Sequence, residues 1–134
     1  MTSSDKVEVR ASAAPSPAGA YSQAVAIDGW CFVSGQVGWR SRELGLEGGV
    51  EQQTRQALHN IDAILSATGA SLRDIVRTTV YLRDFADFKA FNDAYEQTMT
   101  EHGVDVFPAR TTVAASIRVA VEIDAIAKLP EAVE

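Results

Sequence analysis

The first half of the chain contains two short apolar segments with the composition of β-strands. Segments 24–27 (Ala-Val-Ala-Ile) and 30–33 (Trp-Cys-Phe-Val) flank Asp28-Gly29, a dipeptide typical of a two-residue hairpin turn. Residues 7–10 are consistent with one more short strand before them. The pattern therefore predicts a β-hairpin preceded by a short strand.

Glycine and proline mark the segments that leave regular structure. Residues 13–19 contain two prolines and a glycine and predict a loop. Gly35 and Gly38 predict a bulge, or a close approach of two backbones, after the hairpin. Residues 40–49 predict an exposed loop.

The period of the apolar positions then changes to that of a helix. Between residues 50 and 68 they recur at three- and four-residue steps, which predicts a helix that ends before Gly69. A capped helical turn is predicted at 71–74 and a β-branched strand at 75–82. We expect Asp87 to cap a second helix. The apolar stripe of that helix consists of Phe88, Phe91, Tyr95 and Met99.

Residues 110–124 alternate with a period of two, which predicts strand with one packed face. Arg110 and Glu122 both occupy the polar, even positions, which predicts that they share a face. In one long strand they would lie far apart, at about 3.3 Å per residue. If the chain reverses near Ser116, they become cross-strand neighbours. The usual length of strands favours the reversal.

The order of these elements predicts an α/β (α+β) fold, a β-sheet with two helices packed on one face. A chain of 134 residues is expected to form one domain, 1–134. The opposite face of so small a sheet needs cover, which we expect other copies of the chain to supply.

Composition and charge narrow the classes of function. The hydrophobic fraction of 46% is ordinary for a soluble globular protein. A net charge of −6 with scattered Lys and Arg argues against a nucleic-acid partner. The sequence has no apolar run long enough to span a membrane, and its N-terminus lacks the apolar core of a signal peptide. We therefore expect a cytoplasmic protein without a membrane partner.

Arg110 and Glu122 carry the best chemical signal in the sequence. An arginine fork suits a substrate carboxylate, and a nearby glutamate can transfer protons. The alternative is a solvated ion pair between strands, which is common and weak. His59 and His102 have no ligand-spaced partners, and Cys31 is alone, so we expect neither a metal site nor an internal disulfide. Phosphate-binding and nucleophile-elbow motifs are absent.

Six segments that span nearly the whole chain form a recognisable set of motifs. They are Gly-Ala-Tyr-Ser-Gln-Ala-Val at 19–25, Val-Ser-Gly-Gln-Val at 33–37, Gln-Thr-Arg-Gln-Ala-Leu-His-Asn-Ile at 53–61, the middle section 78–92, Phe-Pro-Ala-Arg-Thr at 107–111 and Val-Glu-Ile at 121–123. In this order, the six segments resemble the motifs of one known family, the RidA family, also called YjgF or L-PSP.

This resemblance implies a chorismate-mutase-like fold and a homotrimer with its sites in the clefts between subunits. It also implies hydrolysis of reactive enamines and imines, such as 2-aminoacrylate, 2-iminopropanoate and 2-iminobutanoate, to 2-oxo acids and ammonia. The family's reaction needs no cofactor and no metal. Because free 2-aminoacrylate attacks pyridoxal-phosphate enzymes, the implied role is metabolite damage control.

The resemblance assigns catalytic roles to Arg110, which would hold the substrate carboxylate, and to Glu122, which would activate the attacking water. Tyr21 would supply a hydroxyl and Asn92 a hydrogen bond near the intersubunit rim. The substrate-binding residues that it implies are Tyr21, Gly35, Asn92, Arg110 and Thr112. On pattern alone, Tyr21 is equally a packing residue, and Gly35 is more safely interpreted as a backbone-geometry residue.

The departures from the family pattern bear on the choice of substrate. Ala20 and Gly38 stand where the family usually has proline, and Thr112 stands where many members have cysteine. The connection between Arg110 and Glu122 also looks shorter than usual. We therefore expect some imine hydrolysis with an altered preference, for example for an amino-dienoate. Two other classes remain open: a small-carboxylate-binding or regulatory trimer without turnover, and, least favoured by the acidic charge, an endoribonuclease or translation inhibitor.

Overall fold

A computed structural model describes residues 5–41, 45–46 and 48–131. Its main sheet contains six strands in the order β1-β2-β3-β8-β6-β7. Only β6 and β7 run parallel, and the other neighbours are antiparallel, so the sheet is mixed. The strands are β1 (Val7–Val9), β2 (Ala24–Ile27), β3 (Trp30–Val37), β6 (Ile75–Leu82), β7 (Ala109–Ala114) and β8 (Val121–Lys128).

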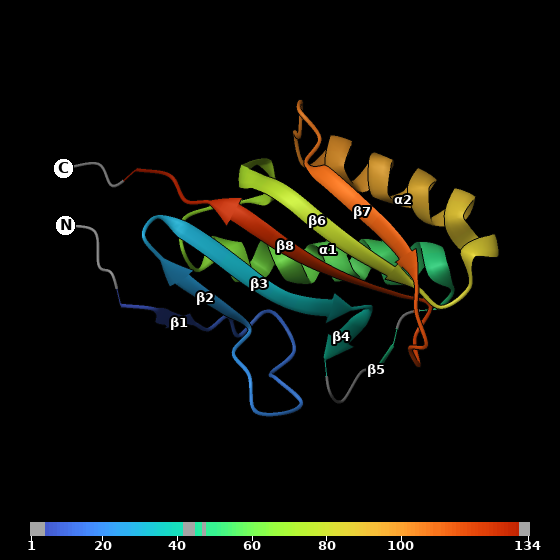
Figure 1. Cartoon of the computed structure of the whole chain (residues 1–134), viewed down its shortest axis with the longest axis horizontal. Helices are drawn as coiled ribbons and strands as arrows, with labels where there is room; N and C mark the ends of the chain where they lie inside the picture. The colour runs from blue at the N-terminus through green and yellow to red at the C-terminus, as the bar shows by residue number, and fades with distance from the viewer. Residues whose placement is uncertain (1–4, 42–44, 47, 132–134) are drawn as a thin grey trace.

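Both helices cover the same face of this sheet, as predicted (Figure 1). Helix α1 (Val50–Ser66) packs behind β3 and β8, and α2 (Phe88–Glu101) packs against α1 and lies beside β7 (Figure 1). Strand β8 shows how the pattern produces the layers: its residues 121, 123, 125 and 127 are buried toward the helices, whereas residues 122 and 124 are half-buried on the other face. Neither helix is long and apolar enough to cross a membrane.

The hairpin and the glycine-marked segment take the predicted forms. Asp28 and Gly29 adopt φ angles of 51° and 80°, the left-handed backbone of a tight hairpin turn. The pairing of β3 with β8 shifts register between Val33 and Gln36, which is the expected bulge. At Gly38 the backbone of α1 comes so close that a Cβ atom would lie 2.5 Å from the Cα of residue 53. Both predicted consequences of the glycines therefore occur.

The prediction of an exposed loop at 40–49 is wrong in part. Strand β4 (Trp39–Ser41) pairs with β5 (Gly45–Leu46) to form a separate two-stranded sheet. Residues 42–44 and 47 lie outside the described residues. These strands are too short for a period of two to be visible in the sequence.

The first helix is confirmed but ends at Ser66, two residues before the predicted end. Gly69 follows with a φ of 84°, the left-handed conformation expected after a helix. Ser71 caps the short helix η1 (Leu72–Asp74) in the predicted reciprocal arrangement, because its hydroxyl accepts from the N–H of Arg73 and its own N–H donates to Asp74.

The prediction that Asp87 caps the second helix is confirmed for its position and wrong for its side chain. Asp87 occupies the position before α2, but its side chain makes no capping hydrogen bond. A helical turn, η2 (Phe85–Asp87), comes first, and the carboxylate of Asp84 accepts from the N–H of Ala86 at 2.9 Å. The backbone of Asp87 already has turn geometry (φ −82°, ψ 2°) rather than the extended conformation that aims a capping side chain at the helix.

The face of the sheet away from the helices bears exposed apolar side chains. Trp30, Phe32 and Val113 are 37%, 46% and 39% exposed. This is the face for which we expected cover from other copies of the chain.

Candidate active site

Arg110 and Glu122 do not meet within one chain. The chain reverses between β7 and β8, so the interpretation as one long strand is wrong. They are not cross-strand neighbours either, because β6 lies between the two strands. Thr78 of β6 pairs with Arg110 on one side of β6, and Tyr81 pairs with Glu122 on the other.

The two side chains also lie on opposite faces of the sheet. Thr78 is fully buried on the helix side, and its register partner Arg110 shares that face. Tyr81 and Glu122 lie on the opposite face. The predicted shared face is therefore wrong, because the connection 115–120 resets the alternation between the strands, and a shift of one residue inverts every side chain.

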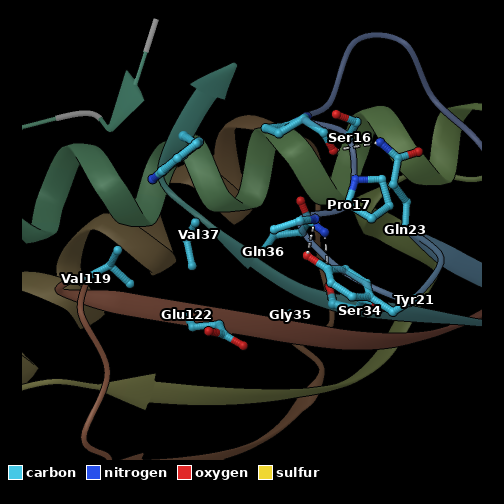
Figure 2. Close-up of a pocket in the computed structure, with 13 residues that line it drawn as sticks. Ser16, Pro17, Tyr21, Gln23, Ser34, Gly35, Gln36, Val37, Val119 and Glu122 are labelled. Carbon is cyan, nitrogen blue, oxygen red and sulfur yellow. Dashed lines mark hydrogen bonds between the residues drawn. The ribbon is translucent and has the colours of Figure 1, made fainter. Parts of the chain in front are cut away.

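Glu122 lies in a pocket of about 550 Å³ formed by loop 15–18, the end of β3 and the start of β8 (Figure 2). Tyr21 and Gly35 also line it, so the structure brings together three of the predicted site residues. Val37, Trp39 and Val119 contribute apolar surface.

Gly35 makes room for the carboxylate of Glu122. A Cβ atom at this position would overlap Oε2 of Glu122 and would lie 2.9 Å from its Cδ. Burial raises the pKa of Glu122, and the negative charge of Asp124 raises it further. A carboxyl group with a raised pKa exchanges its proton closer to neutral pH, as general acid–base catalysis requires.

Tyr21 presents its hydroxyl to the pocket from the loop that precedes β2. The ring is 49% exposed, and its hydroxyl oxygen accepts from the N–H of Ala18 at 3.1 Å. Since this bond uses a lone pair of the oxygen, the hydroxyl proton remains available to donate into the pocket.

Two buried amides of α1 hold other walls of the pocket. Gln53, 4% exposed, accepts from the backbone N–H of Ala120 at 2.9 Å, next to the start of β8. Asn60, 1% exposed, donates to the carbonyl oxygens of Val37 and Trp39 at 3.1 and 2.9 Å. We did not predict these roles from the sequence, because they depend on contacts between residues far apart in the chain.

Arg110 lies against an aromatic platform on α2. Its guanidinium carbon is 4.9 Å from the ring centroid of Tyr95, 5.2 Å from that of Phe91 and 5.7 Å from that of Phe88. These distances fall within the range of cation–π attraction. Tyr95 is fixed in turn by a 2.8 Å hydrogen bond between its hydroxyl and that of Thr78. The apolar stripe predicted on α2 therefore has a second role beside packing, as the support of a cation.

Among the described residues, no carboxylate forms an ion pair with Arg110. The interpretation as an ion pair with Glu122 is thus wrong within one chain. Since burying a guanidinium without a partner is unfavourable, this cation is suited to an anion from outside the chain.

Asn92 and Thr112 lie on the Arg110 side of the molecule. Thr112 is two residues after Arg110 on the same face of β7, and Asn92 follows Phe88 by four residues on α2, one helical turn away. Neither lines the Glu122 pocket. One chain therefore carries two half-sites: the Glu122 half-site (Tyr21, Gly35 and Glu122) and the Arg110 half-site (Asn92, Arg110 and Thr112).

Comparison with known proteins gives matches over most of the chain. The family model described as Endoribonuclease L-PSP matches residues 11–129. A RutC family protein of Aquifex aeolicus is 38% identical over 123 residues, which cover 90% of this chain and 97% of that protein. The 2-iminobutanoate/2-iminopropanoate deaminase of Escherichia coli K12 is 38% identical over 117 residues, 85% of this chain and 91% of the relative.

Solved structures agree with these matches. The crystal structure of E. coli TdcF with bound serine superposes with a TM-score of 0.87 at 32% identity and covers 92% of this chain and 99% of TdcF. RidA from the Antarctic bacterium Psychrobacter sp. PAMC 21119 gives a TM-score of 0.83 at 32% identity, over 92% of this chain and 99% of that one. The chain therefore belongs to the L-PSP family, which is also called the RidA or YjgF family.

Proposed function

We propose that this protein hydrolyses small 2-imino acids and their enamine tautomers to 2-oxo acids and ammonia, at sites shared between subunits of a homotrimer. The observation that carries the proposal is the guanidinium of Arg110, which lies on an aromatic platform and has no carboxylate partner among the described residues. A substrate carboxylate is the anion that fits it.

A trimer supplies what one chain lacks. The two half-sites lie on opposite faces of the sheet, and β7, which carries Arg110, is an edge strand. In a ring of three, the Arg110 half-site of one subunit faces the Glu122 half-site of the next, which gives three equivalent sites. The exposed side chains of Trp30, Phe32 and Val113 would be buried between subunits.

Each half-site has a distinct chemical task. Arg110 binds the substrate carboxylate through paired hydrogen bonds and so fixes the adjacent imine carbon. Asn92 and Thr112, on α2 and β7, supply polar groups on the same side of the molecule as Arg110. The hydroxyl of Tyr21 donates a hydrogen bond to the attacking water or to the substrate.

Glu122 moves the protons. The substrate reacts as the protonated imine, C=NH2+. Glu122 takes a proton from water as the water oxygen bonds to the imine carbon, and the π pair of the C=N bond moves to nitrogen, which gives a neutral carbinolamine. Glu122 then gives this proton to the amine nitrogen, the C–N bond breaks with its electron pair on nitrogen, and ammonia leaves. As the C=O bond of the 2-oxo acid forms, the hydroxyl proton of the intermediate passes to the Glu122 carboxylate, which releases it to solvent water. A carboxyl group with a raised pKa suits both transfers, and the scheme uses water as its only co-reactant.

Two relatives support this choice of substrate. The E. coli relative is named a 2-iminobutanoate/2-iminopropanoate deaminase, which is the reaction proposed here. TdcF was crystallised with serine, a compound that carries a carboxylate and a nitrogen on the same carbon, as a 2-imino acid does.

The test generates 2-iminopropanoate and 2-iminobutanoate in situ with an amino-acid oxidase and traps them with semicarbazide. We expect the wild type to suppress semicarbazone formation. Arg110→Ala should lower kcat/KM roughly ten- to hundredfold, since a hydrogen bond to a charged group contributes about 1.5–3 kcal/mol. The matched control is Arg55→Ala, because Arg55 lies on α1 beside Gln97 and Glu101, away from both half-sites.

Two results would contradict the proposal. One is a wild type that leaves semicarbazone formation unchanged while it binds small 2-oxo acids tightly, which would indicate a binding protein. The other is an Arg110→Ala variant with full turnover.

A further inference from the structure

The pocket of Glu122 has a neighbour of similar size. The two cavities measure about 550 and 560 Å³, and Pro15, Ser16, Pro17 and Gln23 line both of them. Segment 15–17 and the side chain of Gln23 therefore form the wall between the cavities. Because atoms that line a cavity have no packing partner on that side, packing restrains this wall weakly. Its position depends mainly on hydrogen bonds.

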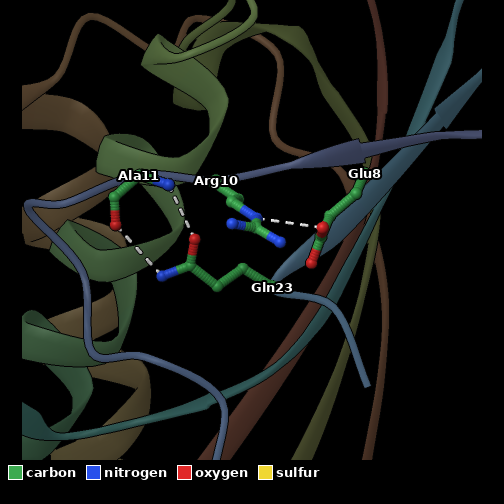
Figure 3. A network of polar contacts seen from close by, with 4 residues as sticks. All are labelled: Glu8, Arg10, Ala11 and Gln23. Carbon is green, nitrogen blue, oxygen red and sulfur yellow. Dashed lines mark hydrogen bonds and ion pairs between the residues drawn. The ribbon is translucent and has the colours of Figure 1, made fainter. Parts of the chain in front are cut away.

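Gln23 supplies those bonds from a buried position, with 5% of its surface exposed. Its Oε1 accepts from the N–H of Ala11 at 2.7 Å, and its Nε2 donates to the carbonyl oxygens of Ala11 at 3.1 Å and Pro15 at 2.9 Å. A longer contact of 3.4 Å reaches the carbonyl of Ala14. Figure 3 shows the paired bonds between Gln23 and Ala11. Both ends of the amide are thus used to hold the segment 11–15.

The ion pair between Arg10 and Glu8 cannot substitute for the hydrogen bonds of Gln23 to the segment 11–15. Arg10 and Glu8 form an ion pair at 2.9 Å (Figure 3), but their side chains are 84% and 42% exposed. An exposed pair of this kind contributes little to stability.

The backbone of Gln23 is itself fixed to the sheet. The N–H of Ser34 donates to the carbonyl of Gln23 at 2.9 Å, and the hydroxyl of Ser34 donates to the carbonyl of Ser22 at 2.7 Å. Ser34 directly precedes Gly35, against which the carboxylate of Glu122 lies. A continuous path of hydrogen bonds therefore joins the floor of the pocket to the segment that leads into Tyr21.

We propose that Gln23 is a positioning residue of the site. Its amide sets the location of loop 11–21, and with it the location of the Tyr21 hydroxyl relative to Glu122. It is not a catalytic residue, because both ends of the amide are bonded to the backbone. The kinetic part of its test rests on the proposed function.

The test compares wild type, Gln23→Met, Tyr21→Phe and the double variant in the semicarbazide assay. Methionine keeps the length of the side chain and removes its hydrogen bonds. We expect Gln23→Met to lower kcat about tenfold or more, because a displacement of about 1 Å is costly to catalysis. The double variant should be no more than about twofold slower than Gln23→Met, since both changes remove the same placed hydroxyl.

A structural control and a second readout accompany the kinetics. Ile64→Val, on the buried face of α1, should lower Tm by a few degrees without changing kcat. Amide hydrogen exchange, which needs no activity, should become faster across 11–21 in Gln23→Met and stay unchanged in α1.

Other outcomes overturn the inference. If Gln23→Met has a lower Tm but an unchanged kcat, Gln23 has only a structural role. If the double variant loses kcat by the product of the two single losses, Gln23 does not act through the position of Tyr21. If the wild type hydrolyses no imine, the proposed function fails. Amide hydrogen exchange of Gln23→Met then tests the positioning role by itself. Faster exchange confined to residues 11–21 supports that role, and unchanged exchange refutes it.

Discussion

A single methyl group at Gly35 should disable the site while leaving the fold intact. The Cβ of a Gly35→Ala variant would overlap Oε2 of Glu122 and lie 2.9 Å from its Cδ. Since carbon atoms pack best at about 3.5–4.0 Å, Cδ has to retreat by about 0.6 Å or more. The neighbouring atoms belong to a flexible side chain, so Glu122 rotates away at a cost of about 0.5–1.5 kcal/mol.

This displacement acts on the group that we propose transfers the protons. A shift of about 1 Å at a reacting group can lower a rate about 100-fold, so we expect kcat to fall roughly ten- to hundredfold, with only a small decrease in Tm. The semicarbazide assay and a thermal melt of the same preparations measure both quantities.

Two glycine variants provide controls. A Cβ atom at Gly19 makes only ordinary contacts, 3.7 Å from the ring of Tyr21, so Gly19→Ala should keep its turnover. At Gly38 a Cβ atom meets the backbone of Gln53 at 2.5 Å, so Gly38→Ala should lower Tm strongly. Wild-type kcat in Gly35→Ala would refute the placement of Glu122 in the reaction.

Three further predictions test separate parts of the site. Asp124→Asn removes a negative charge that raises the pKa of Glu122, so this pKa should fall. Because Glu122 must be ionised to act as a base, the acidic limb of the plot of kcat against pH should move to lower pH, and an unchanged limb would contradict the prediction. Phe88→Leu removes one ring beside Arg110 and should raise KM roughly two- to fivefold at unchanged kcat, from a cation–π contribution of about 0.5–1 kcal/mol, whereas an unchanged KM would argue against the platform. Phe32→Asp places a charge on the exposed sheet face and should reduce the mass in light scattering from three chains to one and abolish turnover; a fully active monomer would refute the shared site.

Local patterns predicted most of the fold. The Asp28-Gly29 hairpin, the helix before Gly69 and the bulge near Gly35 depend on neighbours along the chain, so the sequence contains their signals. Asp87 is at the predicted N-cap position of α2, but its side chain makes no capping bond, because the preceding turn η2 gives its backbone turn geometry and is itself capped by Asp84.

The candidate site was predicted residue by residue, but its arrangement was not. Arg110 and Glu122 are separated because β6 is inserted between their strands, and that pairing joins residues far apart in the chain. They lie on opposite faces because the connection 115–120 resets the alternation. The periodicity of residues 110–124 gives no indication that β6 lies between β7 and β8. The contacts that hold the pocket walls, from Gln53 and Asn60, are long-range for the same reason.

The central claim, that each site takes Arg110 from one subunit and Glu122 from its neighbour, is tested most directly by mixing two impaired variants. Arg110→Ala and Glu122→Gln chains, co-expressed with different tags and purified as mixed trimers, should regain activity. Every mixed trimer, whichever variant is present twice, has one interface in three that combines an intact Arg110 with an intact Glu122, so we expect about a third of the wild-type kcat per chain. If the mixed trimers form and remain as inactive as either parent, the two residues do not act across a subunit interface and the account is wrong.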